Sequence, residues 1–243
     1  MPEPEIIFEN EDFVVVNKPA GLMVHGVRVS EKRRADAARA GSVREIEPTL
    51  VDWLLARYPG IKNVGDDPAL RPGIVHRLDK ATSGVMLVAK TQAAFARLKK
   101  LFQEHRIRKT YFALVRGVPK NEKGIIDAPI GIKNGSLKRS IHSSKMAKPA
   151  VTEYSVIKKI IGKADGEQYA LLKVNPKTGR THQIRVHVAS IGHPIVGDTL
   201  YGRNPSRTEA VPRLMLHAAA IAFEDDDGNS FEFEVPTPPD FVI

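Results

Sequence analysis

The 243-residue sequence contains no cysteine, and this absence excludes disulfide bonds, thiol nucleophiles and cysteine-ligated metal sites. No apolar run is long enough to span a bilayer, and the acidic start Met1-Pro2-Glu3-Pro4-Glu5 is not a secretory signal. Neither a phosphate-binding glycine loop nor a dinucleotide fingerprint is present, so the sequence predicts no cofactor. Because nothing requires an oxidising compartment, we expect a cytoplasmic protein without a membrane segment.

Acidic residues are missing from one segment and concentrated in another. The chain has 37 lysines and arginines against 28 acids, a net charge of +9. Residues 133–148 hold five basic residues and no acid, whereas residues 224–240 hold seven acids and no base. Such segregation is typical of a surface that follows a polyanion. The candidate contacts in the basic segment are Lys138, Arg139, Lys145 and Lys148.

Strand patterns dominate the chain. Apolar, β-branched or alternating runs predict a hairpin over residues 6–16 and further strands at 85–90, 110–116, 151–158, 168–174, 217–223 and 230–235. Helix signals are fewer, and they predict helices that begin at Thr49, at Thr91 and near Thr181. The order predicts an α+β fold around a mixed, mainly antiparallel sheet, with residues 1–243 as one domain. Residues 28–47 are basic and alanine-rich, and we expect them to form a mobile insertion.

One polar stretch separates a Pro72-Gly73 turn from the apolar strand that begins at Val85. It reads His76-Arg77-Leu78-Asp79-Lys80-Ala81-Thr82-Ser83-Gly84. A carboxylate held in a polar loop beside a strand often performs chemistry. The alternative is an ordinary Asx-type turn around Asp79 that Thr82 and Ser83 close.

This stretch resembles the central motif of the RluA family of pseudouridine synthases, whose pattern is H-R-L-D-x-x-T-S-G. Four further motifs follow the order of that family: Val16-Asn17-Lys18-Pro19, Lys109-Thr110-Tyr111, Gly179 to Gly202, and Leu214-Met215-Leu216-His217-Ala218. The resemblance implies a curved sheet in two halves with an RNA-binding cleft between them. Since the motifs begin almost at once, we expect no S4-like domain before them.

The resemblance also implies roles for single residues. Asp79 matches the catalytic aspartate, and Arg185 matches the basic residue that pairs with it. Tyr111 matches the tyrosine that packs on the target base and is a candidate for removing the C5 proton. Leu216 matches an apolar pocket residue, and Arg77 matches the arginine that fills the stack when the uridine is flipped out. Without the resemblance, Arg185 could be a surface helix residue and Tyr111 a half-buried strand aromatic.

The histidines do not predict a metal site. His182 and His187 are five residues apart, about 140° around a helix, so they do not share a face. We interpret these two, together with His76 and His217, as structural residues or RNA contacts. His76 opens the central motif and is included among the candidate substrate-binding residues.

Three classes of function remain. The leading one is an RNA pseudouridine synthase, a monomeric isomerase that acts on a flipped uridine of ribosomal or transfer RNA. An alternative is a catalytically silent RNA-binding or ribosome-assembly protein of the same fold, and the joint presence of Asp79, Tyr111 and Arg185 argues against it. A hydrolase of nucleosides or glycans usually needs two carboxylates, but only Asp79 lies in a motif. The sequence does not say which uridine is modified, or whether Asp79 attacks C1′ or removes the C2′ proton.

Overall fold

The computed structural model describes residues 3–26, 47–133, 138–162, 166–202, 211 and 213–241. The predicted insertion over residues 28–47 lies outside these ranges, apart from Glu47. The described elements in chain order are β1 (Glu5–Glu9), β2 (Phe13–Lys18), α2 (Leu50–Arg57), the 3-10 turn η1 (Pro59–Asn63), β3 (Ser83–Ala89), α3 (Gln92–Gln103), β4 (Arg108–Arg116), β5 (Lys123–Asp127), β6 (Gly131–Ile132), β7 (Arg139–Ser140), β8 (Val151–Ile161), β9 (Gln168–Pro176), α4 (Gln183–Ser190), β10 (Leu216–Glu224) and β11 (Ser230–Glu234).

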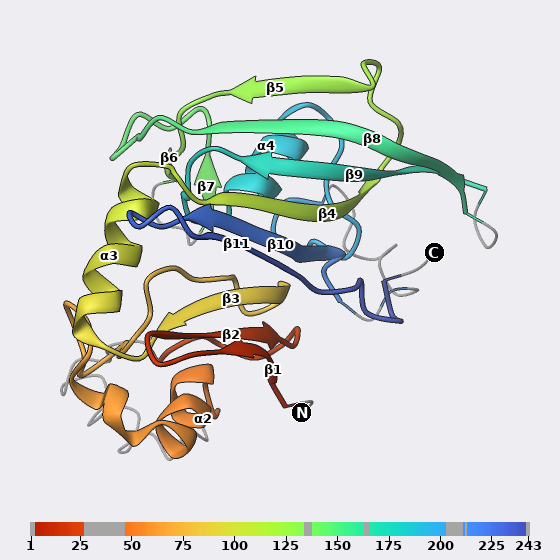
Figure 1. Cartoon of the computed structure of the whole chain (residues 1–243). Helices are drawn as coiled ribbons and strands as arrows, with labels where there is room; N and C mark the ends of the chain where they lie inside the picture. Colours follow the sequence, from red (N-terminus) through yellow and green to blue (C-terminus); the bar gives the residue numbers. More distant parts are fainter. Residues whose placement is uncertain are drawn as a thin grey trace, which may run out of the picture.

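One long curved sheet organises the fold (Figure 1). Among the described residues its strands run in the order β1-β2-β3-β10-β4-β9-β8-β5, and β11 also pairs with β10. Every neighbouring pair is antiparallel except β3 and β10, which are parallel. The predicted mixed, mainly antiparallel α+β fold is therefore confirmed.

The sheet divides at β10. β4 pairs along one edge of β10, so β3 and β11 must share the other edge. β3 pairs only with His217 and Ala218 of β10, whereas β11 pairs with β10 from Ala220 onward. Gly84 makes this short junction possible, because a Cβ there would lie 2.1 Å from the Ala218 carbonyl oxygen and its φ is +119°.

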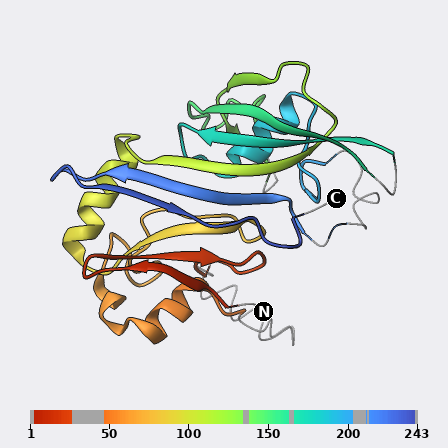
Figure 2. The same ribbon diagram turned by 45° about the vertical axis from the view of Figure 1, so that its right-hand side comes forward.

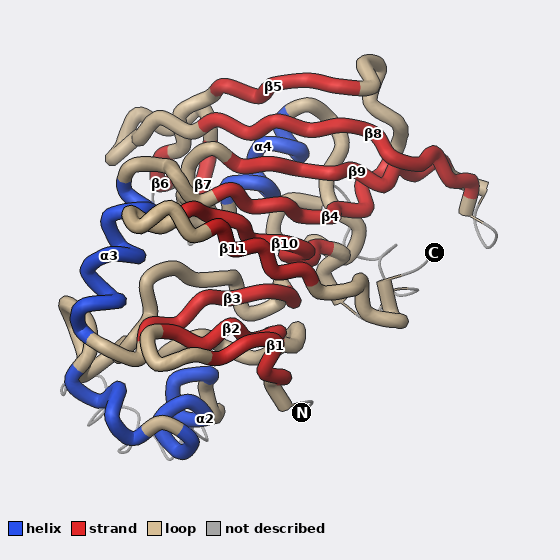
Figure 3. The backbone as a smooth tube through the Cα atoms, viewed as in Figure 1, coloured by secondary structure: helices blue, strands red, loops and turns tan. Residues whose placement is uncertain are grey.

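Each half of the sheet has its own hydrophobic core. The first core packs α2 and α3 against β2 and β3, as Figures 1 and 2 show. The second packs α4 against β4, β9 and β10, and Figure 3 shows α4 behind the strands of that half. Tyr111 on β4 packs against both cores. The boundary between the cores therefore runs past the residues that the sequence singled out.

Capping residues fix the helices as predicted, with one exception. Thr49 and Asp52 form a reciprocal capping box at the start of α2, and the Thr91 side chain caps α3. α4 begins at Gln183 rather than near Thr181, because His182 adopts a left-handed conformation with φ of +57°. The helix ends at Ser190, and Ile191, which follows it, is 38% exposed. No helix in the described ranges is long and apolar enough to cross a membrane.

Candidate active site

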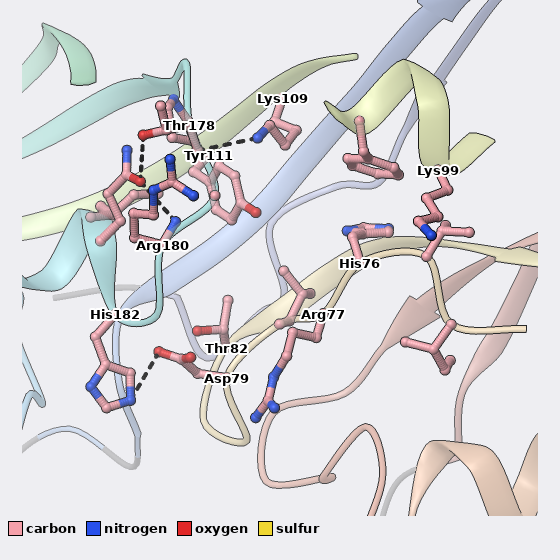
Figure 4. Close-up of a pocket in the computed structure, with 18 of the residues that line it drawn as sticks. His76, Arg77, Asp79, Thr82, Lys99, Lys109, Tyr111, Thr178, Arg180 and His182 are labelled. Atoms are coloured by element: carbon pink, nitrogen blue, oxygen red, sulfur yellow. Dashed lines mark hydrogen bonds and ion pairs between the residues drawn. The ribbon is translucent and has the colours of Figure 1, made fainter. Parts of the chain in front are cut away.

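A pocket of about 610 Å³ opens where the two halves of the sheet diverge. Its walls come from the loop before β3, the start of α4 and the first residues of β4 and β10. Figure 4 shows Asp79 and Thr82 near its floor, with Tyr111, Lys109 and Arg180 on one side. Elements that are far apart in the sequence therefore face one common space.

The Asp79 carboxylate lies in this pocket with its side chain 21% exposed. Arg185, which comes from α4, donates from Nη1 to Asp79 Oδ2 at 3.1 Å. His182 Nε2 lies 3.8 Å from the same oxygen. A carboxylate in a largely enclosed site needs such donors to stay charged. The predicted pairing of Asp79 with Arg185 is therefore present in the structure.

Arg185 is itself held by a second, fully buried carboxylate. Its Nε and Nη2 both donate to Asp198 at 2.8 Å, which leaves only Nη1 for Asp79. Asp198 also accepts backbone N–H bonds from Leu200 and Tyr201 at 2.9 and 3.0 Å. Burial opposes the charge on Arg185, but the hydrogen bonds and negative charge of Asp198, with those of Asp79, raise the pKa of Arg185. The guanidinium is thus permanently charged and fixed in one plane.

A buried lysine fixes the loop that carries Asp79. Lys18, at the end of β2, is fully buried and donates from Nζ to the carbonyl oxygens of Pro19, Leu22 and Lys80 at 2.8, 2.8 and 3.2 Å. Burial lowers the pKa of Lys18 to about 7, and the negative charge of Asp79 opposes the shift. Lys18 therefore joins β2 to the residue that follows Asp79.

Tyr111 presents a free hydroxyl to the pocket. No hydrogen bond joins this hydroxyl to a described residue, although the ring packs against both cores. Burial, and then the charge of Asp79, raise the pKa of Tyr111 far above its ordinary value. The hydroxyl is therefore protonated at neutral pH. The Tyr111 hydroxyl can accept the C5 proton only if it gives its own proton to another group. Packing of the Tyr111 ring against a base requires no ionisation.

The sharp turn before α4 depends on the Gln183 amide. Gln183 Oε1 accepts from Thr178 Oγ1 and from Arg180 N at 2.7 and 2.9 Å, and Nε2 donates to the Val151 carbonyl at 3.0 Å. These bonds tie the 178–183 loop to β8. They explain why His182 can take a strained conformation that directs its ring toward Asp79.

The sequence profile of the family described as RNA pseudouridylate synthase matches residues 12–190. The chain belongs to this family. It is 41% identical over 228 residues to an uncharacterised RNA pseudouridine synthase of Aquifex aeolicus, covering 89% of this chain and 64% of that protein. It is 38% identical over 247 residues to a ribosomal large subunit pseudouridine synthase D of Zymomonas mobilis, covering 98% and 71%. The chain thus spans about two thirds of the length of these relatives. The predicted resemblance to RluA-type pseudouridine synthases, which are isomerases, is confirmed.

Solved pseudouridine synthases have the same fold. The structure of human RNA pseudouridylate synthase domain containing 1 aligns with a TM-score of 0.74 and 30% identity, over 99% of this chain and 86% of that one. Human domain containing 4 aligns with a TM-score of 0.68 and 25% identity, over 97% and 89%. The fold of the pseudouridine synthase therefore extends over nearly all of this chain.

Three further predicted residues line the pocket. Leu216 is buried in the wall, and Arg77 is exposed at the mouth with Nη1 3.2 Å from His25 Nε2. His76 also lines it, but its Nε2 accepts the Leu87 backbone N–H at 2.9 Å and its ring stacks on Phe102. Burial lowers the pKa of His76 to about 3, so it is a neutral wall residue.

The buried histidines bond to the protein's own groups. His187 bonds Thr152 Oγ1 at 2.8 Å and the Ala128 carbonyl at 3.0 Å. His217 bonds Ser83 Oγ at 2.9 Å and the Val235 carbonyl at 3.3 Å, which ties β3 to β10. No group of three potential metal ligands occurs among the described residues.

The four basic candidates lie outside the pocket. Lys138, Lys145 and Lys148 are exposed beside the β6–β7 hairpin. Arg139 differs, because its backbone N–H donates to the Tyr201 hydroxyl, which in turn bonds His182 Nδ1 at 2.9 Å. The hairpin is therefore linked to the pocket by two hydrogen bonds, and its contact with RNA stays a prediction.

Several residues in or beneath the pocket carry no assigned role in the sequence motifs. Asp198 lies in a quoted motif, but only the fold shows that it holds Arg185. Lys109 and Arg180 also belong to quoted motifs and line the pocket. In the sequence, each of these residues is a charged residue beside an apolar strand or a glycine turn. Many exposed side chains fit the same description, so the pattern does not identify pocket residues.

Proposed function

We propose that this chain converts uridine to pseudouridine in ribosomal or transfer RNA and that Asp79 acts on the sugar of a flipped uridine. The observation that best supports this proposal is that the Asp79 carboxylate is partly open to a pocket and is held by Arg185. The name of the Zymomonas relative makes large-subunit ribosomal RNA the first substrate to test.

The reaction breaks the bond from C1′ to N1, turns the base and joins C1′ to C5, while C5 gives up its proton and N1 takes one up. Asp79 supplies the negative charge that meets the sugar, by attack at C1′ or by removal of the C2′ proton. Arg185 keeps that charge in place, and it costs no reorganisation because Asp198 already fixes the guanidinium. Tyr111 and Leu216 confine the freed base so that it can turn without leaving.

A hydrolase is the second candidate to weigh, since a glycosidase needs a pair of carboxylates. The pocket contains one other carboxylate, Asp66, among its described lining residues. Asp66 is paired with Lys99 at 2.9 Å, and Lys99 is not shared with Asp79. Asp66 therefore serves as a matched control for the chemistry of Asp79.

The decisive experiment measures tritium release from RNA labelled at uridine C5, with three proteins. Wild-type protein and Asp66→Asn should release tritium, and Asp79→Asn should release none while binding RNA with little change, because phosphates supply most of the affinity. Formation of free uracil would favour a hydrolase. Tritium release by Asp79→Asn would refute the proposed mechanism, and a wild-type protein that binds RNA without releasing tritium would favour the silent alternative.

A further inference from the structure

Lys109 is a cation in the pocket that the proposed chemistry does not use. It stands near the start of β4, and its Nζ donates to the Thr178 carbonyl oxygen at 3.3 Å. Among the described residues no carboxylate lies within 4.0 Å of it. An ammonium group has three donors, so two remain for a ligand. Burial lowers the pKa of Lys109 to about 8, and no anion of the described protein offsets that cost.

Arg180 brings a second cation to the same wall. Its Nε donates to the Pro149 carbonyl at 3.0 Å, and its two terminal nitrogens bond no described residue. Gly179 precedes Arg180, and a Cβ there would lie 4.0 Å from Lys109 Nζ. The missing side chain keeps the space beside the ammonium open.

The position of Lys109 relative to Tyr111 limits what the pair can bind. Residues two apart on a strand point to the same face and are about 7 Å apart. Figure 4 shows Lys109 and Arg180 on the Tyr111 side of the pocket, across from His76 and Arg77. A ligand bound at Lys109 would therefore adjoin a base that packs on Tyr111.

The charge of the pocket favours an anion at this position. Six lysines and arginines line it against two carboxylates. Asp66 is paired with Lys99 and Asp79 with Arg185, so neither carboxylate neutralises the Lys109 wall. In an RNA substrate the available anions are backbone phosphates.

We propose that Lys109 and Arg180 bind the backbone phosphate that adjoins the flipped uridine and so position the nucleotide chain along β4. This inference rests on the proposed function. Lys109 and Arg180 are binding residues here, and the bond-breaking steps remain with Asp79.

The test compares Lys109→Gln and Arg180→Gln with wild type on C5-tritiated RNA from cells that lack this protein. KM should rise about tenfold, as for a lost charge-assisted contact, while kcat changes less than threefold. The logarithmic salt dependence of kcat/KM should flatten by about 0.7 to 0.9 for each variant. Lys109→Arg should retain the wild-type slope. Lys177→Gln is the matched control, since Lys177 is exposed nearby and paired with Glu153 at 2.7 Å.

A second arm replaces single phosphates by methylphosphonates on either side of the target uridine in a synthetic stem-loop. One replacement should raise KM for wild type and have no further effect on the double variant Lys109→Gln/Arg180→Gln. An unchanged salt slope, or equal sensitivity of both proteins to each replacement, would overturn the phosphate site. If wild type itself releases no tritium, the proposed function fails instead.

Discussion

Replacing Asp198 by asparagine should weaken the fold and slow the reaction while RNA binding stays intact. Asp198 is fully buried and accepts two bonds from Arg185 and two from backbone N–H groups. Asparagine is uncharged and has one oxygen, so its amide would oppose one of the guanidinium N–H groups. Breaking a buried ion pair costs about 3–5 kcal/mol. In a chain of this size that lowers Tm by about 6–12 °C at the lower end of the range.

The catalytic cost follows from the same contacts. Arg185 reaches Asp79 through Nη1 alone, so its position depends on the two bonds to Asp198. A displacement of about 1 Å costs about 10²-fold in rate. We therefore expect kcat to fall about 10²-fold, with KM for RNA unchanged because Asp198 is not exposed to RNA.

Asp240→Asn is a matched control, since Asp240 accepts two bonds from Arg213 at 2.7 and 2.9 Å but is 44% exposed. Such a pair contributes at most about 1 kcal/mol, so Tm should fall by less than about 4 °C and kcat should not change. Thermal denaturation measures the loss of Tm in each variant. Single-turnover rates, taken well below both Tm values, measure the change in the chemical step. A normal kcat in Asp198→Asn would refute the view that Asp198 positions Arg185.

Three further results are expected. Arg77→Ala should lose more activity on a structured stem-loop than on a flexible strand, because Arg77 at the pocket mouth can fill the stack that the uridine leaves; equal losses would assign it to chemistry or plain phosphate binding. RNA affinity should decline by about tenfold in total as the pH rises through 8, because Lys109 with a pKa of about 8 loses its charge there, whereas His76, with a pKa of about 3, is already neutral. Binding that is equally pH-dependent in Lys109→Gln would contradict this. Neutralising the four basic residues of the hairpin, Lys138, Arg139, Lys145 and Lys148, should reduce the slope of log affinity against log salt by about one for each lost phosphate contact. An unchanged slope would place the hairpin away from RNA.

Local patterns predicted most of the elements, because they depend on neighbours in the chain. The alternation around Asn10 predicted the first hairpin, and its side-chain oxygen accepts the N–H groups of Asp12 and Phe13. Thr49 predicted the start of α2, where the capping box is formed. The start of α4 was misplaced because the left-handed turn at His182 depends on Gln183 and β8, which no local pattern encodes.

The active site was less predictable, because its contacts join distant segments. Asp79 and Arg185 are 106 residues apart, and only the family resemblance brought them together in advance. Lys18 resembles any exposed strand-end lysine in sequence, yet it is fully buried under three carbonyl oxygens. The side chains that position the catalytic groups are thus the least visible in the sequence.

The junction at Gly84 and Ala218 has a consequence for exchanging segments between relatives. Asp79 belongs to the half before this junction and Arg185 to the half after it, so a chimera with one crossover between them combines two lineages in one ion pair. The two parents must then agree on a glycine at 84, since any Cβ would meet the Ala218 backbone at 2.1 Å. A crossover that leaves Asp79 and Arg185 from the same parent should give active chimeras more often than a crossover between them. This should hold even when the sequence identities of the parents are equal.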